Sequence, residues 1–235
     1  MAAALLTGHS LPAYGGAKEN IRLFQSFFHD VAFTRLAYAQ GAADYNSYQF
    51  SDVYSLTARA GFPLTLELDL GLELGFLNIN PDFAESRSGL TDLMTSVRYN
   101  FISDVTVFAG GAYITLPTGN EDVGQNNIDF GVFGAVRHPV SEYVVLTGTL
   151  GLDFIEVGDG RRTSLYVGAG SVFETSDYIH LVGELAIRTE YDYAALSGGI
   201  EYNLPSPGKL RGMLLVGLDD GAPDFGFSFG YLITF

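Results

Sequence analysis

Charged side chains recur at alternate positions in several strand-like stretches of this 235-residue chain. A period of two places such residues on one face of a β-strand, opposite the apolar residues between them. On one shared wall, carboxylates and arginines can brace one another through ion pairs, or line a polar path whose charges select solutes. The candidate residues on these mainly polar faces are Arg59, Glu67, Asp69, Glu73, Asp92, Arg98, Asp129, Arg137, Asp153, His180, Glu184, Arg188, Glu201, Lys209, Arg211 and Asp224.

Three of these carboxylates, Glu67, Asp69 and Glu73, fall on one face of a single stretch. They could bind a cation, but salt bridges to arginines on adjacent strands are the favoured interpretation, because buried charges are normally paired. The whole set holds nine acids and six fixed bases. If it lines an open lumen, this excess of acids predicts a weak preference for cations.

Signals for enzymatic chemistry are poor. The sequence has no G-x-S-x-G elbow, no H-E-x-x-H helix and no glycine-rich phosphate loop opening a helix. The four histidines, His9, His29, His138 and His180, do not cluster, although a triad that uses His138 or His180 stays open. We therefore predict no catalytic residues, no metal ligands and no cofactor.

The elements that would position the charged faces are strands. Alternation of apolar and polar residues recurs in stretches of about 10–12 residues, the length with which a tilted strand crosses a bilayer. It predicts an all-β fold, a transmembrane antiparallel up-and-down barrel of about twelve strands. The predicted strands cover residues 28–40, 53–62, 65–77, 90–101, 105–116, 128–138, 143–155, 162–173, 178–188, 193–204, 209–218 and 224–235.

The last stretch, Asp224 to Phe235, has the clearest pattern. One face carries Phe or Tyr at four successive alternate positions and then Ile233 and Phe235, and only Leu232 interrupts the other, mainly polar face. A closing strand that ends on phenylalanine resembles those of bacterial outer-membrane barrels. Through it we expect contact with the barrel-assembly machinery.

Composition supports a Gram-negative outer-membrane location. Charged residues make up 17% of the chain, against about 25% in soluble domains. Only two lysines are present, which excludes a basic face for nucleic acid. No stretch approaches the roughly 20 apolar residues of a spanning helix, and a closed barrel is then the remaining way to cross. A soluble β-sandwich or lipocalin-like binder would need the apolar faces turned inward.

The amino-terminal part is harder to interpret. Residues 1–20 are predicted to be a vestigial or trimmed export segment or a periplasmic start, and residues 21–235 a single barrel domain. Within the domain, Ile21 to Asp30 follows neither the helical nor the strand period. This stretch could be a periplasmic plug, a short helix or an early start to the first strand.

The connections alternate in length, and the net charge of −15 is concentrated in those expected outside the cell. Short turns on one side and longer loops on the other are typical of membrane barrels. Outer-membrane lipid is an expected partner of the barrel, and the acids in these loops are expected to contact lipopolysaccharide through divalent cations. The acids are Asp44, Asp52, Asp82, Glu85, Glu121, Asp122, Glu156, Asp159, Glu190, Asp192, Asp219 and Asp220.

From Ser88 onward the chain resembles the putative MetA-pathway-of-phenol-degradation family of outer-membrane barrels. The resemblance rests on Gly89-Leu90-Thr91-Asp92 leading into Val97-Arg98-Tyr99, on Tyr113 to Gly119 with its Leu-Pro-Thr-Gly strand end, and on Asp129-Phe130-Gly131. It covers about residues 88–235. It implies a barrel that passes small, often hydrophobic or aromatic compounds, and it supplies no catalytic residues.

Together these observations predict a porin-like channel or transporter for passive passage of small solutes, including hydrophobic or aromatic ones, through a narrow polar lumen. Twelve strands lie between small barrels filled by side chains and wide aqueous porins. An outer-membrane lipid-modifying enzyme and a purely structural barrel are the alternatives.

Overall fold

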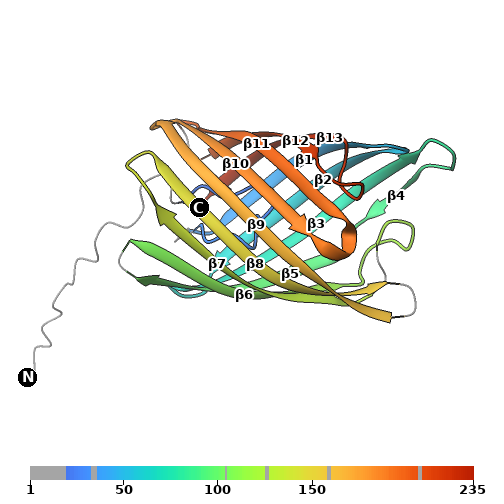
Figure 1. Cartoon of the computed structure of the whole chain (residues 1–235), viewed down its shortest axis with the longest axis horizontal. Coiled ribbons are helices and arrows are strands. Elements are labelled where there is room, and N and C mark those ends of the chain that lie inside the picture. Colours follow the sequence, from blue (N-terminus) through green and yellow to red (C-terminus); the bar gives the residue numbers. More distant parts are fainter. Residues whose placement is uncertain (1–19, 33–35, 104, 125–126, 158–159, 206–207) are drawn as a thin grey trace, which may run out of the picture.

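The computed structural model describes residues 20–32, 36–103, 105–124, 127–157, 160–205 and 208–235. Its strands form one closed antiparallel sheet in which β13 pairs with β1 and β2 pairs with β3 (Figure 1). The short β4 and the longer β5 both pair with β3 and count as one interrupted strand. The barrel therefore has twelve strands around its wall, which confirms the predicted fold class.

The strands are β1 (Tyr38–Tyr48), β2 (Ser51–Pro63), β3 (Leu68–Pro81), β4 (Arg87–Leu90), β5 (Leu93–Ser103), β6 (Thr106–Leu116), β7 (Asp129–Pro139), β8 (Val144–Val157), β9 (Gly160–Ser176), β10 (Ile179–Arg188), β11 (Tyr193–Asn203), β12 (Gly208–Gly217) and β13 (Phe225–Thr234). A 3-10 turn, η2 (Thr189–Tyr191), joins β10 to β11. Among the described residues, no helix is long and apolar enough to cross a membrane.

The apolar strand faces point outward. Leu150 on β8 is 58% exposed, whereas Asp153 three residues later is 2% exposed. On β13, Phe225, Phe227 and Phe229 are exposed in the same way. Such a ring of apolar side chains suits lipid, and the inward face holds the charges.

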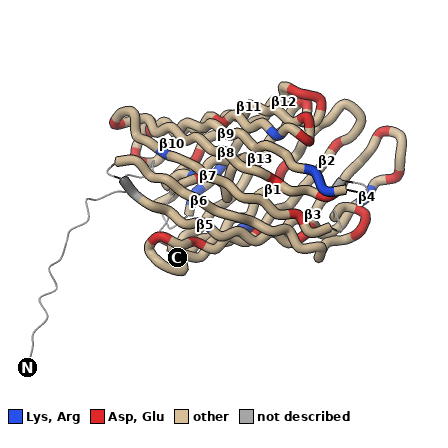
Figure 2. Tube along the Cα trace, turned by 60° about the horizontal axis from the view of Figure 1, so that its bottom comes forward, with Lys and Arg blue, Asp and Glu red and all other residues tan. Residues whose placement is uncertain are grey.

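The two ends of the barrel differ. At the end where β13 finishes, the connections between strands have at most four residues, whereas 117–128 and 218–224 at the other end are longer. Short turns mark the periplasmic end of bacterial barrels, and longer loops mark the extracellular end. In Figure 2 acidic segments are prominent in the loops at the end where β4 lies, as expected for an acidic outer rim. Contact of this rim with lipopolysaccharide stays a prediction.

The first strand lies further along the chain than predicted. The sequence placed it at 28–40, with a long outer loop from Gly41 to Asp52, but β1 runs from Tyr38 to Tyr48 and a tight turn leads into β2. The outward face of β1 carries the small residues Ala39, Gly41 and Ala43, so it lacks the apolar contrast that identifies the other strands. Backbone pairing with both β13 and β2 specifies it instead.

Three predicted loop acids therefore belong to strands. Asp44 lies in β1, Asp52 in β2 and Glu156 near the end of β8. Asp159 and residues 1–19 of the predicted export segment lie outside the described residues.

Residues 20–32, here called the inner segment, are not part of the wall. They form turns and bends within the ring of strands (dark blue in Figure 1), and all of them except Asn20 and Gln25 are buried. Of the three interpretations left open for Ile21 to Asp30, the plug is therefore correct.

The orientation of the strands can be tested by a charge on the lipid face. We expect Leu150→Arg, in the middle of β8, to destabilise the barrel by about 2–4 kcal/mol in bilayers. Tyr143→Arg, at an exposed position in the periplasmic β7–β8 turn, should cost only about 0–1 kcal/mol. Urea titration of folding into lipid vesicles measures both. Equal costs would mean that the strand register is shifted by one residue.

Candidate functional site

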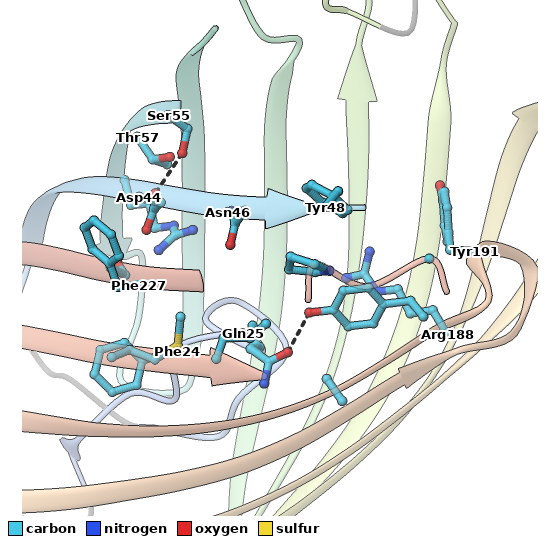
Figure 3. Close-up of a pocket in the computed structure, with 18 of the residues that line it drawn as sticks. Phe24, Gln25, Asp44, Asn46, Tyr48, Ser55, Thr57, Arg188, Tyr191 and Phe227 are labelled. Atoms are coloured by element: carbon cyan, nitrogen blue, oxygen red, sulfur yellow. Dashed lines mark hydrogen bonds between the residues drawn. The ribbon is translucent and has the colours of Figure 1, made fainter. Parts of the chain in front are cut away.

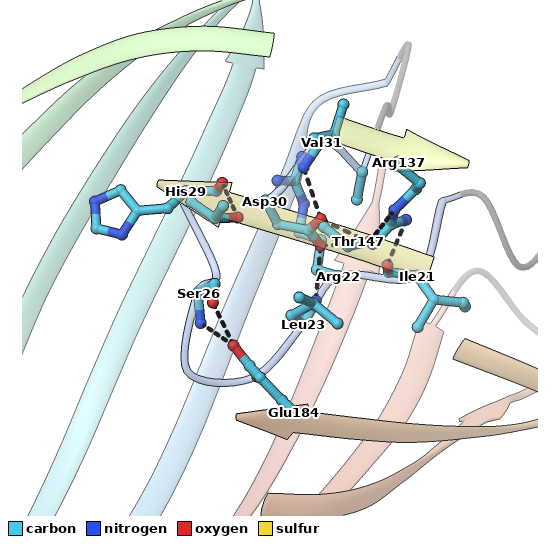
Figure 4. A network of polar contacts seen from close by, with 12 residues as sticks. Ile21, Arg22, Leu23, Ser26, His29, Asp30, Val31, Arg137, Thr147 and Glu184 are labelled. Atoms are coloured by element: carbon cyan, nitrogen blue, oxygen red, sulfur yellow. Dashed lines mark hydrogen bonds and ion pairs between the residues drawn. The ribbon is translucent and has the colours of Figure 1, made fainter. Parts of the chain in front are cut away.

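The inner segment is held first by Glu184, a carboxylate on β10. Its Oε2 accepts hydrogen bonds from the amides of Phe24 (3.0 Å) and Gln25 (2.8 Å), and its Oε1 accepts one from the amide of Ser26 (2.7 Å). The Ser26 hydroxyl donates to the same Oε1 (Figure 4). Hydrogen bonds to a charged acceptor are the strong ones, and this carboxylate fixes the turn of the segment to the wall.

A buried ion pair holds the far end of the segment. Both carboxylate oxygens of Asp30 accept a hydrogen bond from Arg137 Nη2 on β7, each at 2.8 Å, and both side chains are almost completely buried. Asp30 also accepts from the amides of Leu23 (2.8 Å) and Val31 (2.6 Å). The same carboxylate thus closes the segment on itself and ties it to the wall (Figure 4).

Two further wall arginines bind backbone carbonyls of the segment. Arg98 on β5 donates to Asp30 O and Ala32 O and pairs with Asp69 at 2.5 Å. Arg211 on β12 donates to Arg22 O and pairs with Glu201 at 3.1 Å. Each arginine is therefore charge-balanced by the wall while its other donors hold the segment.

Apolar contacts also hold the inner segment in its place inside the barrel, and we call this place its seat. Ile21, Leu23 and Phe24 pack with Val145 and Val172 of the wall, in a cluster that also includes Val182. A second cluster joins Phe27 and Phe28 to Tyr38 and Leu232. Leu232 is the one apolar residue on the polar face of the last strand, and this contact explains it.

Above the segment, toward the extracellular end, lies a cavity of about 440 Å³ that we call the outer cavity. Figure 3 shows side chains from the inner segment, β1, β2 and the β10–β11 region converging on it. Its floor includes Phe24 and Gln25, and Gln25 is fixed by bonds to Tyr193 and Ser197, each 2.8 Å. The outer cavity thus lies on the extracellular side of the inner segment, which fills the periplasmic side of the lumen.

A second cavity of about 310 Å³ lies beside it. It is lined by Glu73, Asp92, Asp129 and Asp153 and by His29, and we call it the acidic cavity. Arg188 and Tyr191 line both cavities. Within the described residues, no group of three or more His, Asp or Glu side chains is placed to hold a metal ion.

The structure distributes the candidate residues from the sequence among distinct places. Arg98, Arg137, Glu184 and Arg211 contact the inner segment, and Asp69 and Glu201 pair with two of these arginines. Glu73, Asp92, Asp129, Asp153 and Arg188 line the acidic cavity, Arg59 pairs with Glu73, Lys209 pairs with Glu201, and His180 is buried.

Two candidates need correction. Glu67 is exposed in the periplasmic turn between β2 and β3, and Asp224 is exposed in the loop before β13. Each of them directly precedes the first residue of the strand whose alternation it continues, β3 for Glu67 and β13 for Asp224. Without them seven acids face six bases, so the argument for cation preference loses most of its basis.

The sequence missed the groups that come from the inner segment and from β1. Asp30 and Arg22 lie in a stretch with no period, and Asp44 was assigned to a loop. The only signal in the sequence was that irregular stretch of apolar and charged residues before the first strand.

The buried ring of His29 predicts that the stability of the inner segment in its place depends on pH. Its ring packs against Tyr113, Phe133 and Tyr166 at centroid distances of 4.9–5.3 Å. Burial, with a smaller contribution from Arg188, lowers the pKa of His29 to about 3. If the segment were released, the pKa of His29 would return to about 6.5. Below that pH, His29 would therefore bind a proton in the released state but not in the buried state.

We therefore expect the seat of the segment to be fully stable above about pH 6.5 and to weaken progressively as the pH falls from there toward about 3. Channel conductance in planar bilayers should rise with acidification over this window. His29→Gln should remove much of that rise. An identical pH profile in this variant would exclude His29 as its cause.

A closed barrel with an apolar exterior and a charged, partly filled lumen defines an outer-membrane β-barrel protein. The chain belongs to the family described as "Putative MetA-pathway of phenol degradation", whose model matches residues 29–235. The match confirms the resemblance seen in the sequence and extends it toward the amino terminus, as far as the last four residues of the inner segment. Comparison with curated protein sequences gave no significant match.

Several solved outer-membrane barrels share the fold. The COG4313 outer membrane channel from Pseudomonas putida F1 is similar with a TM-score of 0.74 at 13% identity, covering 88% of this chain and 98% of that one. The KdgM porin, in complex with disordered oligogalacturonate, has a TM-score of 0.63 at 10% identity and covers 84% and 99%. The P. putida toluene transporter TodX has a TM-score of 0.56 at 8% identity and covers 86% and 91%.

Proposed function

We propose that the protein is a passive outer-membrane channel for small solutes, including hydrophobic and aromatic ones, in which the inner segment restricts passage. The observation that carries the proposal is the lumen itself. Its extracellular half holds two cavities, and its periplasmic half is filled by a segment outside the wall that is tied to it by side chains. A purely structural barrel has no need of such cavities above a separately held segment.

The names of the similar barrels support this proposal. One is an outer membrane channel, one a porin and one a toluene transporter. The family description, which refers to phenol degradation, agrees with a small aromatic solute. None of these three names describes an enzyme.

The test is ion and solute flux through the purified protein. In planar bilayers we expect small conductance steps from the narrow path, and in liposomes we expect entry of small aromatic compounds. A barrel that stays electrically silent and impermeable, even in variants whose inner segment is released, would be structural. Silence together with deacylase or esterase activity on lipids would favour the enzyme.

A further inference from the structure

Arg188 differs from the other arginines and the lysine on the inward face of the barrel wall. It is the last residue of β10 and lines both the outer and the acidic cavity. The wall residues Arg59, Arg98, Arg137, Lys209 and Arg211 each form an ion pair with a carboxylate. In the part of the chain that the structure describes, no carboxylate lies within ion-pair distance of Arg188.

A guanidinium that faces a cavity without a counter-ion is suited to bind an anion. Its planar fork of N–H donors matches the two oxygens of a carboxylate, which it can bind through two parallel hydrogen bonds. Arg188 is supported by the ring of Tyr166, whose centroid lies 5.1 Å from its Cζ. This contact orients the fork without neutralising its charge.

The surroundings of Arg188 in the outer cavity suit an amphipathic molecule. Arg188, Tyr191 and Tyr48 all line this cavity (Figure 3). Phe24, Met213 and Leu215 supply apolar surface to the same cavity. A volume of about 440 Å³ lies within the usual range for small-molecule sites, roughly 300–1,000 Å³.

Nearby carboxylates limit the charge of the occupant. The acidic cavity on the other side of Arg188 carries four of them, and Asp44 stands at the far end of the outer cavity, where it accepts a bond from Ser55 (2.9 Å). A second anionic group on the ligand would be repelled by these carboxylates. The ligand that fits the outer cavity best therefore has one negative charge, placed at Arg188, and an uncharged body.

We propose that Arg188 is the anion-binding group of a solute site in the outer cavity, and that the site takes small monocarboxylates with an aromatic or short aliphatic body. This inference rests on the proposed channel function and names its substrate class. The occupant would wait on the extracellular side of the inner segment, with its carboxylate on Arg188 and its body against Phe24, Met213 and Leu215.

Benzoate is a suitable probe, and benzamide is its uncharged match. Isothermal titration calorimetry of the full chain in detergent should show saturable benzoate binding and much weaker benzamide binding. Arg188→Gln should weaken benzoate binding roughly 10- to 100-fold, as expected for loss of hydrogen bonds to a charged group. Benzamide binding should be unchanged. Arg188→Lys keeps the charge but not the fork of N–H donors, so its affinity for benzoate should lie between those of the wild type and Arg188→Gln.

Arg162→Gln is the control. It removes the same charge at the extracellular rim, where Arg162 pairs with Glu190 (3.2 Å), without lining either cavity, and it should leave benzoate binding unchanged. Equal benzoate binding by the wild type and Arg188→Gln would overturn the proposal, and so would equal binding of benzoate and benzamide. The Arg188→Lys variant decides the question if Arg188→Gln does not fold.

Flux separates this inference from the proposed function. Binding that depends on Arg188 in a barrel that passes no solute would support the site and contradict the channel. Passage of benzoate and benzamide at equal rates, together with no effect of Arg188→Gln, would support the channel and overturn the site.

Discussion

We expect Asp30→Asn to weaken the seat of the inner segment by about 3–5 kcal/mol, because it removes the carboxylate that balances a buried arginine. Arg137 is only 2% exposed, and its bonds to Thr147 Oγ1 and Ile21 O supply no negative charge. The substitution also weakens the hydrogen bonds that the carboxylate of Asp30 accepts from the backbone amides of Leu23 and Val31. The segment should then leave the lumen much more often.

A single cysteine can report this release, since the chain has none. Val31 is 1% exposed, and in Val31→Cys the rate of maleimide labelling measures how often the segment leaves. Asp30→Asn should raise that rate on the order of 10²-fold or more, where about 1.4 kcal/mol corresponds to a factor of ten.

The matched control removes both charges. Asp30→Asn combined with Arg137→Met leaves no buried charge behind, and such replacements are often close to neutral. Labelling should return most of the way toward the rate of the otherwise unchanged protein. If the double variant is labelled as fast as Asp30→Asn alone, the ion pair is not what holds the segment.

Most of the barrel wall could be predicted from the sequence because each strand carries its own evidence. In β8, Leu150 and Leu152 alternate with Thr149 and Asp153, and the structure turns the leucines outward and buries the other two. This contrast exists within one short stretch and needs no knowledge of neighbouring strands. Strand β1, with Ala39, Gly41 and Ala43 outward, has no such contrast and was misplaced.

The inner segment could not be predicted in the same way, because its structure is imposed from a distance. Ser26 and Glu184 are 158 residues apart in the sequence, and no local pattern links them. The abundant glycines of the strands were visible, but not the reason for them. A Cβ at Gly170 would lie 2.6 Å from Leu23 Cδ1, so this glycine makes room for the segment.

For the individual charged residues, too, the sequence predicts the face of the strand but not the partner. Alternation placed Asp153, Glu184 and Glu201 on the inward face, where all three are buried. It could not show that Glu184 binds backbone amides while Glu201 binds Lys209 and Arg211. Partners depend on which strands are adjacent and on what fills the lumen, and both are set by the closed barrel.

Glu184→Ala should release the turn in the middle of the inner segment, residues 24–26. The carboxylate accepts three amide bonds and one hydroxyl bond, and a hydrogen bond to a charged group contributes about 1.5–3 kcal/mol. Even if water replaces part of this, the seat should weaken by about 3 kcal/mol, close to 10²-fold in the docking equilibrium. Larger or longer conductance steps should then appear in planar bilayers.

Glu73→Ala provides the comparison that separates release from a change in lumen charge. Glu73 is also an inward carboxylate, but its ion pair is with Arg59 on the adjacent strand, at 2.6 Å. It should alter ion preference while leaving the size of the steps nearly unchanged. Of these two carboxylates, only Glu184 binds the backbone of the inner segment. Equal increases in conductance from both variants would therefore mean that charge, and not the position of the inner segment, controls the path.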